Sequence, residues 1–287
     1  MGCGIEFLKW LSETDRIPRR GRLLDIGESC LLAATPAELE FVLRRHGCEL
    51  DDEHLRPLAE ELAFRSNIYG APCIQTLFLG DVLRLTQVEY VSFDVVSAWY
   101  ADLFDLNRHS LAPAHHNTFD VVLNFGTTEH LINQHNAYKV MHEACKPGGY
   151  MFHQVPSTGY INHGYFCYNA LMFKELAEAN RYEMVDLWFY GPNGSGGNVL
   201  VNGDQFPGVL DGAKLRNNVS GLRSTDVPNA LINVLYRKTT ADEFRVGLEV
   251  KTAAASLDSN TRYYSPYISA AGSPSAANGL FPRRAAG

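Results

Sequence analysis

Short apolar runs alternate with segments of helical periodicity along most of this 287-residue chain. Runs that are apolar throughout are typical of strands covered on both faces, as in a parallel sheet between layers of helices. We therefore predict an α/β fold with a doubly wound, mostly parallel, seven-stranded sheet. The predicted strands are 22–26, 89–93, 101–104, 119–124, 149–155, 184–190 and 230–237.

The segments between the predicted strands have the features of amphipathic helices. Apolar residues recur at intervals of three and four within 55–63, 74–85 and 137–145, which predicts helices with one core-facing stripe. Thr35 is followed by a proline and, three positions on, by Glu38, a pattern typical of a capped helix start. Several of these helices precede the second strand, so we expect a helical insertion after the first strand.

The composition of the chain divides it into a folded domain and a tail. We expect a domain over 1–251, with the helical insertion at about 30–87. Glycine and asparagine are frequent within about 191–229, which predicts a long loop or lid. Alanine, serine, glycine and proline dominate 252–287, and this segment is predicted to be a largely disordered tail.

Charge and cysteine content narrow the function classes. The formal net charge is −7, so the chain lacks the broad basic field that would hold a nucleic-acid backbone, and we expect no nucleic-acid partner. No apolar run approaches the roughly 20 residues of a membrane span, so we expect no membrane partner. The six cysteines include no Cys-x-x-Cys pair and predict reduced, packed thiols in a cytoplasmic protein.

Polar residues and glycine follow several predicted strands at the edge where a doubly wound sheet binds ligands. Asp25 and Gly27 end the first strand, Asp94 ends the second, Asp105 follows the third, and the fourth leads into 124–130. An acid at such a strand end can accept two hydrogen bonds from a ribose diol. A glycine lets the backbone approach a ligand, and the amides of a helix start nearby can hold a carboxylate.

In this order these segments, with the turn at 146–149, resemble the class I methyltransferases that use S-adenosylmethionine, and the resemblance spans 22–237. It implies a Rossmann-like methyltransferase fold and S-adenosylmethionine as the cofactor. The chain departs from the family pattern after its first strand, where Gly27 is the one glycine of a turn that usually has two or three.

The resemblance also assigns residues to parts of the cofactor. Asp105 and Leu106 would border the adenine, and Asp25 would organise the glycine turn. Asn124 and Phe125 would line the methionine portion. With Gly27 and Asp94, this gives seven candidate cofactor-binding residues.

Two histidines are candidate catalytic residues. His163 lies in a loop after the fifth strand whose small polar and aromatic residues suit an acceptor pocket, and it is the preferred candidate for a base. His130 follows the fourth strand; a structural role for either histidine remains an alternative. Glu129 and His130 resemble a metal-binding pair of some quinone-precursor O-methyltransferases. The further carboxylate of that pattern is replaced by Gly126, so we expect no metal.

The predicted function is S-adenosylmethionine-dependent methyl transfer to a small-molecule acceptor, at oxygen or nitrogen. Two alternatives stay open at this stage: a non-catalytic binding or regulatory protein of the same fold, suggested by the reduced glycine turn, and a protein methyltransferase. The sequence predicts neither the acceptor nor the oligomeric state.

Overall fold

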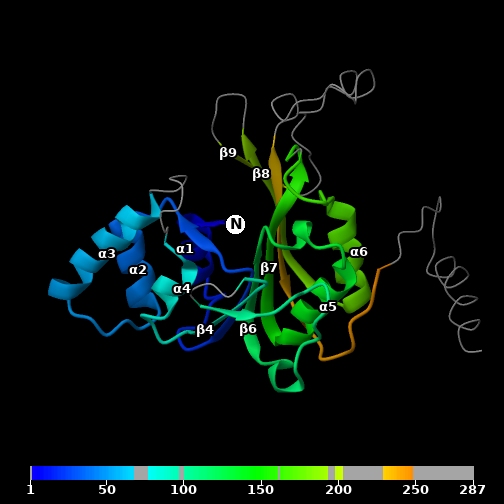
Figure 1. The fold of residues 1–287 in the computed structure, drawn as a ribbon, viewed down its shortest axis with the longest axis horizontal. Coiled ribbons are helices and arrows are strands. Elements are labelled where there is room, and N and C mark those ends of the chain that lie inside the picture. The colour runs from blue at the N-terminus through cyan, green and yellow to red at the C-terminus, as the bar shows by residue number, and fades with distance from the viewer. Residues whose placement is uncertain are drawn as a thin grey trace, which may run out of the picture. The chain divides into compact units, whose positions relative to one another are not determined.

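The computed structural model describes residues 2–67, 77–96, 100–160, 162–192, 198–202 and 229–247. They belong to a unit that ends at Gly247 (Figure 1). The strands of its main sheet are β2 (Arg22–Ile26), β4 (Glu89–Asp94), β5 (Ala101–Leu103), β6 (Phe119–Phe125), β7 (Cys145–Thr158), β8 (Glu183–Pro192), β9 (Asn198–Asn202) and β10 (Ala230–Arg237). They form an eight-stranded sheet in the order β5-β4-β2-β6-β7-β10-β8-β9.

The sheet is doubly wound and mostly parallel, as predicted. The strands β5, β4, β2, β6 and β7 pair in parallel. Strand β10 lies antiparallel between β7 and β8, so β8 has the same direction as β7. All seven predicted strands are present.

The eighth strand corrects one prediction. Strand β8 continues to Pro192, and β9 pairs with it in antiparallel register, so this part of the expected loop at 191–229 is a pair of strands. The remainder of that loop, 193–197 and 203–228, lies outside the described residues, as does the expected tail at 252–287.

The helices are α1 (Ile5–Glu13), α2 (Pro36–Arg45), α3 (Asp52–Ser66), α4 (Leu79–Leu83), α5 (Gln134–Ala144) and α6 (Ala170–Asn180), with short 3-10 turns η1 (Pro113–His115) and η2 (Thr128–His130). Helix α2 begins with the predicted capping box: the Thr35 hydroxyl accepts from the Glu38 amide, and the Glu38 carboxylate accepts from the Thr35 amide. Helices α2, α3 and α4 form the predicted insertion between β2 and β4. Only 79–83 of the predicted helix at 74–85 is helical, and 68–76 is outside the described residues.

A small second sheet replaces an expected helix start. Strand β1 (Gly2–Gly4) pairs in parallel with β3 (Cys30–Leu32), and the facing residues Cys3 and Leu31 are completely buried. The chain therefore enters a strand directly after the Gly27 turn, and the next helix begins only at Pro36. The prediction that helix-start amides lie beside Gly27 is wrong, because residues 30–32 are used to pair with the N-terminal strand.

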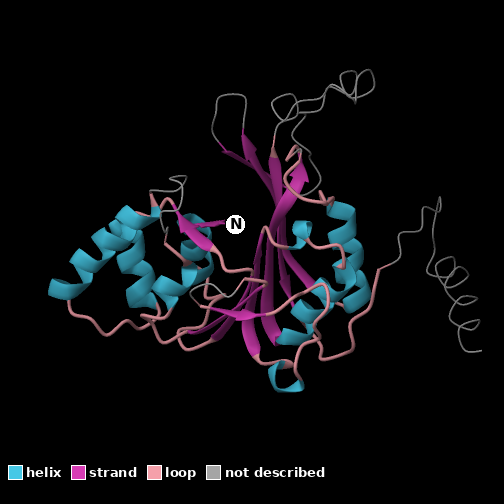
Figure 2. Ribbon diagram, viewed as in Figure 1, coloured by secondary structure: helices cyan, strands magenta, loops and turns pink. Residues whose placement is uncertain are grey.

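Helices cover both faces of the main sheet, with α1 to α4 on one side and α5 and α6 on the other (Figures 1 and 2). Successive strand residues face opposite sides, and this divides the core in two. Leu23 packs with the insertion helices, whereas its neighbour Leu24 packs with α5 and α6. The central strands are thus buried on both faces, as their continuous apolar sequences predicted.

Candidate active site

The candidate site lies at the carboxyl edge of the sheet, where the strand order reverses. The chain leaves β2 toward β4 and β5 on one side and returns to β6 on the other, so β2 and β6 are neighbours at the reversal point. Ligands of doubly wound sheets bind at this point, because the connections there diverge and leave a crevice. The Thr127 hydroxyl donates to the Ile26 carbonyl and joins the two strand ends.

The turn after β2 is held by the buried carboxylate of Asp25. One Asp25 oxygen accepts from the Ser29 amide at 2.9 Å and from the Tyr90 hydroxyl at 2.8 Å, and the other accepts from the Ser29 hydroxyl at 2.9 Å. Burial raises the pKa of Asp25 to about 7, although these hydrogen bonds oppose the shift. Gly27 has a φ of 84°, the left-handed conformation that glycine adopts without strain.

Asp94 lies at the end of β4, directly opposite this turn. Its Oδ2 accepts from the Glu28 amide and its Oδ1 from the Val96 amide, both at 3.1 Å. The carboxylate is half-buried. These two backbone amides orient it at the surface of the crevice. A carboxylate can accept about four hydrogen bonds, and two acceptor positions therefore remain for a ligand.

Glu28 is a residue of this edge that the sequence reasoning missed. Its Oε1 accepts from the Tyr100 amide at 2.7 Å, whereas its Oε2 is buried and has no hydrogen-bond partner among the described residues. Burial raises the Glu28 pKa, and the nearby Asp94 charge adds to the shift. The signal available in the sequence was an acidic residue next to Gly27, inside a turn where the family usually has small residues.

The segment after β5 places apolar side chains beside a carboxylate. Leu106 is buried, and Asp105 is half-buried and accepts from the Asn107 amide at 2.9 Å. Just before them, the Phe104 ring stacks on Phe93 with 4.4 Å between ring centroids. An apolar wall next to a carboxylate is the type of surface that binds a planar heterocycle.

Asn124 and Phe125 have their side chains in the protein interior. The Asn124 amide donates to the Thr128 hydroxyl at 3.0 Å, and its oxygen accepts from the Thr127 amide at 3.2 Å. The Phe125 ring is buried and lies 5.4 Å from the ring of Phe152. Both side chains thus shape the end of β6, and the expectation that these two residues line the methionine portion of the cofactor stays a prediction.

The residues after β6 and β7 bring together a carboxylate and two imidazoles. Glu129 lies in η2 with a side chain that is 1% exposed. Its Oε1 is 3.8 Å from Nε2 of His163 and 4.0 Å from Nε2 of His130. The two rings are half-exposed and pack edge to face, with 5.0 Å between their centroids. The structure therefore joins both predicted catalytic histidines at one point, around a glutamate that was not among the predicted site residues.

Burial determines the electrostatics of this cluster. It raises the pKa of Glu129 to about 7 and lowers the pKa of His130, since each group is less stable when charged away from water. The Oε2 atom of Glu129 is buried and has no hydrogen-bond partner in the described part of the chain. A buried acceptor of this kind is available to a ligand.

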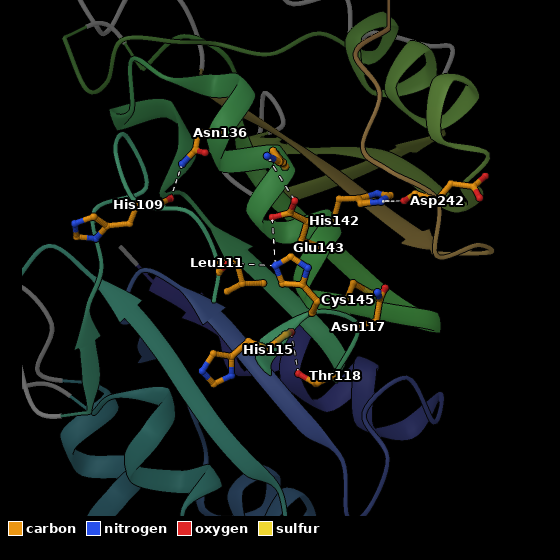
Figure 3. A network of polar contacts seen from close by, with 12 residues as sticks. His109, Leu111, His115, Asn117, Thr118, Asn136, His142, Glu143, Cys145 and Asp242 are labelled. Carbon is orange, nitrogen blue, oxygen red and sulfur yellow. Dashed lines mark hydrogen bonds and ion pairs between the residues drawn. The ribbon is translucent and has the colours of Figure 1, made fainter. Parts of the chain in front are cut away.

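A second polar region lies at the amino ends of β6 and β7 and surrounds a cavity of about 400 Å³. Figure 3 shows part of its polar network, including His142 and Asp242. His142 donates from Nε2 to the Asp242 carbonyl at 2.7 Å, so its Nδ1 is the acceptor for the Tyr182 hydroxyl at 2.6 Å. Lys238 is 1% exposed and also lines this cavity. These groups join the segment after β10 to helix α5, which gives them a structural role.

Comparison with known proteins identifies the family. Residues 41–193, just over half of the chain, match the profile of a family described as "Methyltransferase domain". The chain belongs to this family. It is an S-adenosylmethionine-dependent methyltransferase with a Rossmann-like fold, as the sequence resemblance implied.

Solved structures that resemble this methyltransferase do so distantly. One is the 1,6-didemethyltoxoflavin-N1-methyltransferase of Burkholderia thailandensis, with 1,6-didemethyltoxoflavin and S-adenosylhomocysteine bound; it has a TM-score of 0.39 and 12% identity, covering 82% of this chain and 78% of that one. A SAM-dependent methyltransferase of Archaeoglobus fulgidus has a TM-score of 0.39 and 13% identity, covering 81% and 94%. No curated protein matches the chain.

The groups at the carboxyl edge of this methyltransferase fit S-adenosylmethionine. Asp94 keeps acceptor positions for a diol, and the buried, unpartnered Oε2 of Glu28 offers a further acceptor beside it. Gly27 presents backbone without a side chain at the same turn.

Within the described segments, no helix combines the length and the apolar character that a membrane crossing requires.

Proposed function

We propose that this methyltransferase acts on a small-molecule acceptor, at an oxygen or a nitrogen atom, and that His163 and His130 are its catalytic residues. The observation that carries the proposal is the cluster of Glu129, His130 and His163 at the carboxyl edge of the sheet. The half-exposed imidazoles can be reached by an acceptor.

The proposed cofactor contacts involve the strand ends on the other side of β2. Asp94 accepts from the ribose hydroxyls, and Asp105 and Leu106 border the adenine. Asp25 maintains the Gly27 turn through its bonds to Ser29, and backbone groups of that turn face the cofactor. When bound, S-adenosylmethionine supplies a methyl group that passes to the acceptor atom as the carbon–sulfur bond breaks and leaves its electron pair on sulfur.

The histidines bind and orient the acceptor and take its proton. Nε2 of His163 is well placed to accept a hydrogen bond from an acceptor O–H or N–H, which directs the lone pair of that atom toward the methyl group. Glu129 lies 3.8 Å from the same nitrogen and stabilises the protonated ring once the proton has moved. His130 contacts the other side of the acceptor.

Binding and turnover together test this proposal. Isothermal titration is expected to give micromolar affinity for S-adenosylmethionine and S-adenosylhomocysteine and none for NAD. Formation of S-adenosylhomocysteine is then measured by mass spectrometry with a panel of phenols, carboxylic acids and amines, and separately with a peptide library. We expect turnover with a small molecule, lowered about 100-fold or more by His163→Gln. Turnover with peptides alone would instead support a protein methyltransferase.

His54→Gln is the matched control, because His54 is an exposed histidine of α3. It should leave both cofactor affinity and turnover unchanged. Loss of cofactor affinity in His163→Gln, rather than loss of turnover, would contradict the assignment of this residue to the acceptor.

A further inference from the structure

Three groups with the chemistry of metal ligands meet at the acceptor side of the site. One ligand atom from each of Glu129, His130 and His163 can be chosen so that all three lie within 4.8 Å of one another. The two contacts to the Glu129 oxygen, at 3.8 and 4.0 Å, are too long for direct hydrogen bonds. They leave space between the three groups for a small ion, and a modest contraction would bring each ligand atom to coordination distance.

The burial and incomplete pairing of the Glu129 carboxylate favour a cation as the ligand of this cluster. Its side chain is 1% exposed, and Oε2 has no partner among the described residues. A buried carboxylate oxygen without a hydrogen bond is costly, and a cation offsets that cost directly. The histidines provide neutral nitrogen ligands on the open side of the carboxylate, where an ion can enter.

The loop that carries His163 is attached to the backbone of Glu129 itself. The Glu129 carbonyl accepts from the Tyr165 amide at 2.7 Å and from the Phe166 amide at 3.3 Å. Gly164 makes this approach possible, because a Cβ there would lie 2.9 Å from Cγ of Glu129 and 3.0 Å from its carbonyl oxygen. The position of His163 relative to Glu129 is therefore determined by main-chain contacts.

Backbone conformation on the other side of His163 is also unusual. Tyr160 and Asn162 have φ values of 49° and 63°, in the left-handed region that favours glycine. The His163 amide donates to the Tyr160 carbonyl at 3.0 Å and closes this turn. Such strained residues persist where the surrounding structure imposes them, and they are enriched at ligand sites.

We propose that Glu129, His130 and His163 form a binding site for a divalent transition-metal ion of the Zn²⁺ type. Two imidazoles favour such an ion over Mg²⁺ or Ca²⁺, which select oxygen ligands. One carboxylate and two histidines also leave coordination positions open, as in catalytic zinc sites. The sequence expectation of no metal considered position 126 for the third ligand, whereas the structure supplies it from the loop after β7.

This inference rests on the proposed function, because the open positions would receive the acceptor's oxygen or nitrogen. An ion that holds an acceptor hydroxyl lowers its pKa and so favours loss of the proton to water before methyl transfer. In the metal-bound protein the imidazoles would hold the acceptor in place through the ion, whereas in the metal-free protein they take its proton directly, as proposed above.

The test is a titration of the metal-free protein, residues 1–287, with Zn²⁺ alone, and calorimetry measures the binding. We expect one ion per chain with micromolar or tighter affinity, and at least a tenfold weaker affinity in each of Glu129→Gln, His130→Gln and His163→Gln. The control His54→Gln should bind as the original protein does. Co²⁺ added in place of Zn²⁺ should give a visible ligand-field spectrum that the three variants lose.

Binding of S-adenosylhomocysteine is measured on the same samples to separate a local loss from unfolding. All three variants should keep that affinity within about twofold. Zinc binding that is absent, or that persists unchanged in the three variants, would overturn the metal site. If the metal site is overturned but cofactor binding and turnover remain and resist chelators, the proposed function survives with the histidines as free bases. If zinc binds but the cofactor does not, the proposed function fails and the metal site stands.

Discussion

Lys238 and Glu129 are buried charged residues beside histidines at opposite edges of the sheet, but they differ in how completely their polar atoms are paired. At the amino edge, Lys238 donates to Asn117 Oδ1 at 2.8 Å and to the carbonyls of His142 at 2.6 Å and Cys145 at 2.8 Å. At the carboxyl edge, Glu129 is equally buried, yet its Oε2 lacks a partner among the described residues.

This difference separates groups that maintain the fold from groups available for binding. A buried polar atom costs free energy unless it is paired, so a fully paired network stabilises the chain around it. An unpaired atom at the edge where doubly wound sheets bind ligands is available to accept a hydrogen bond or an ion from a ligand. The presence of histidines alone would not have distinguished the two edges.

The largest expected effect comes from removing the buried amine of Lys238 at the amino edge of the sheet. Lys238→Met leaves the buried carbonyls of His142 and Cys145 without this donor and should lower the free energy of unfolding by about 3–5 kcal/mol, measured by urea denaturation. Lys139→Met is the control, because Lys139 forms a partly exposed ion pair with Glu143 at 3.6 Å, and its loss should cost less than about 1 kcal/mol. Equal effects of the two substitutions would contradict the structural role of Lys238.

The next effect tests the carboxyl edge through its cofactor contacts. Asp94→Ala removes a charged acceptor and should weaken S-adenosylhomocysteine binding by about 1.5–3 kcal/mol, roughly 10- to 100-fold, in isothermal titration. Asp102→Ala, at an exposed carboxylate on neighbouring β5, should leave the affinity unchanged. An Asp94→Ala protein that binds within twofold of the original would remove Asp94 from the site.

The pH dependence of the free energy of unfolding tests the contribution of His142 at the amino edge. Burial lowers the pKa of His142 to about 4, while the unfolded chain has a histidine pKa of about 6.5. Between these values the unfolded state takes up a proton at His142 that the folded state does not, so this residue alone should lower the stability by about 2 kcal/mol as the pH falls from about 6.5 to 4.

Denaturation at several pH values measures this dependence. His142→Gln should be less stable at pH 7 and should show a flatter pH profile over the same interval. The exposed residue His54 provides the control, and His54→Gln should keep the original slope. A profile of His142→Gln parallel to that of the original protein would show that another group controls the acid sensitivity.

The smallest effect concerns the loop that carries His163. Gly164→Ala forces a Cβ against Glu129 and should cost about 1 kcal/mol of stability. The Tyr165 amide, which donates to the Glu129 carbonyl, should exchange its hydrogen faster, measured by NMR. The Gly27 amide, bonded to the Phe93 carbonyl at 2.8 Å, should keep its exchange rate, and a change at both amides would argue against a local displacement.

Local patterns in the sequence were sufficient wherever the relevant contacts are local. The capping box of Thr35 and Glu38 joins residues three positions apart, and the start of α2 agrees with the prediction. The alternating faces of β2 follow from the period of a strand, so the burial of Leu23 and Leu24 was also predictable. The strand ends at the carboxyl edge follow from the parallel order of the sheet.

The candidate site was less predictable because its contacts join distant segments. The pairing of β3 with the N-terminal strand replaced the helix start expected beside Gly27, and no local signal at 30–32 indicates that partner. Glu28 meets Asp94 across 66 positions, and Asn124 directs its amide inward to the turn after β6. Side-chain direction at these positions depends on loops whose conformation the residue pattern does not specify.

The sequence by itself determined the class of fold, the edge of the sheet at which to look for chemistry, and the family. Periodicity and strand-end residues carry this information, since both express the local geometry of helices and strands. Only the tertiary structure decided that His163 lies beside Glu129 and His130, and that Glu129 Oε2 is buried without a partner in the described chain. Burial and pairing arise from packing between distant segments, and they distinguish a histidine that maintains the fold from one that can bind a ligand.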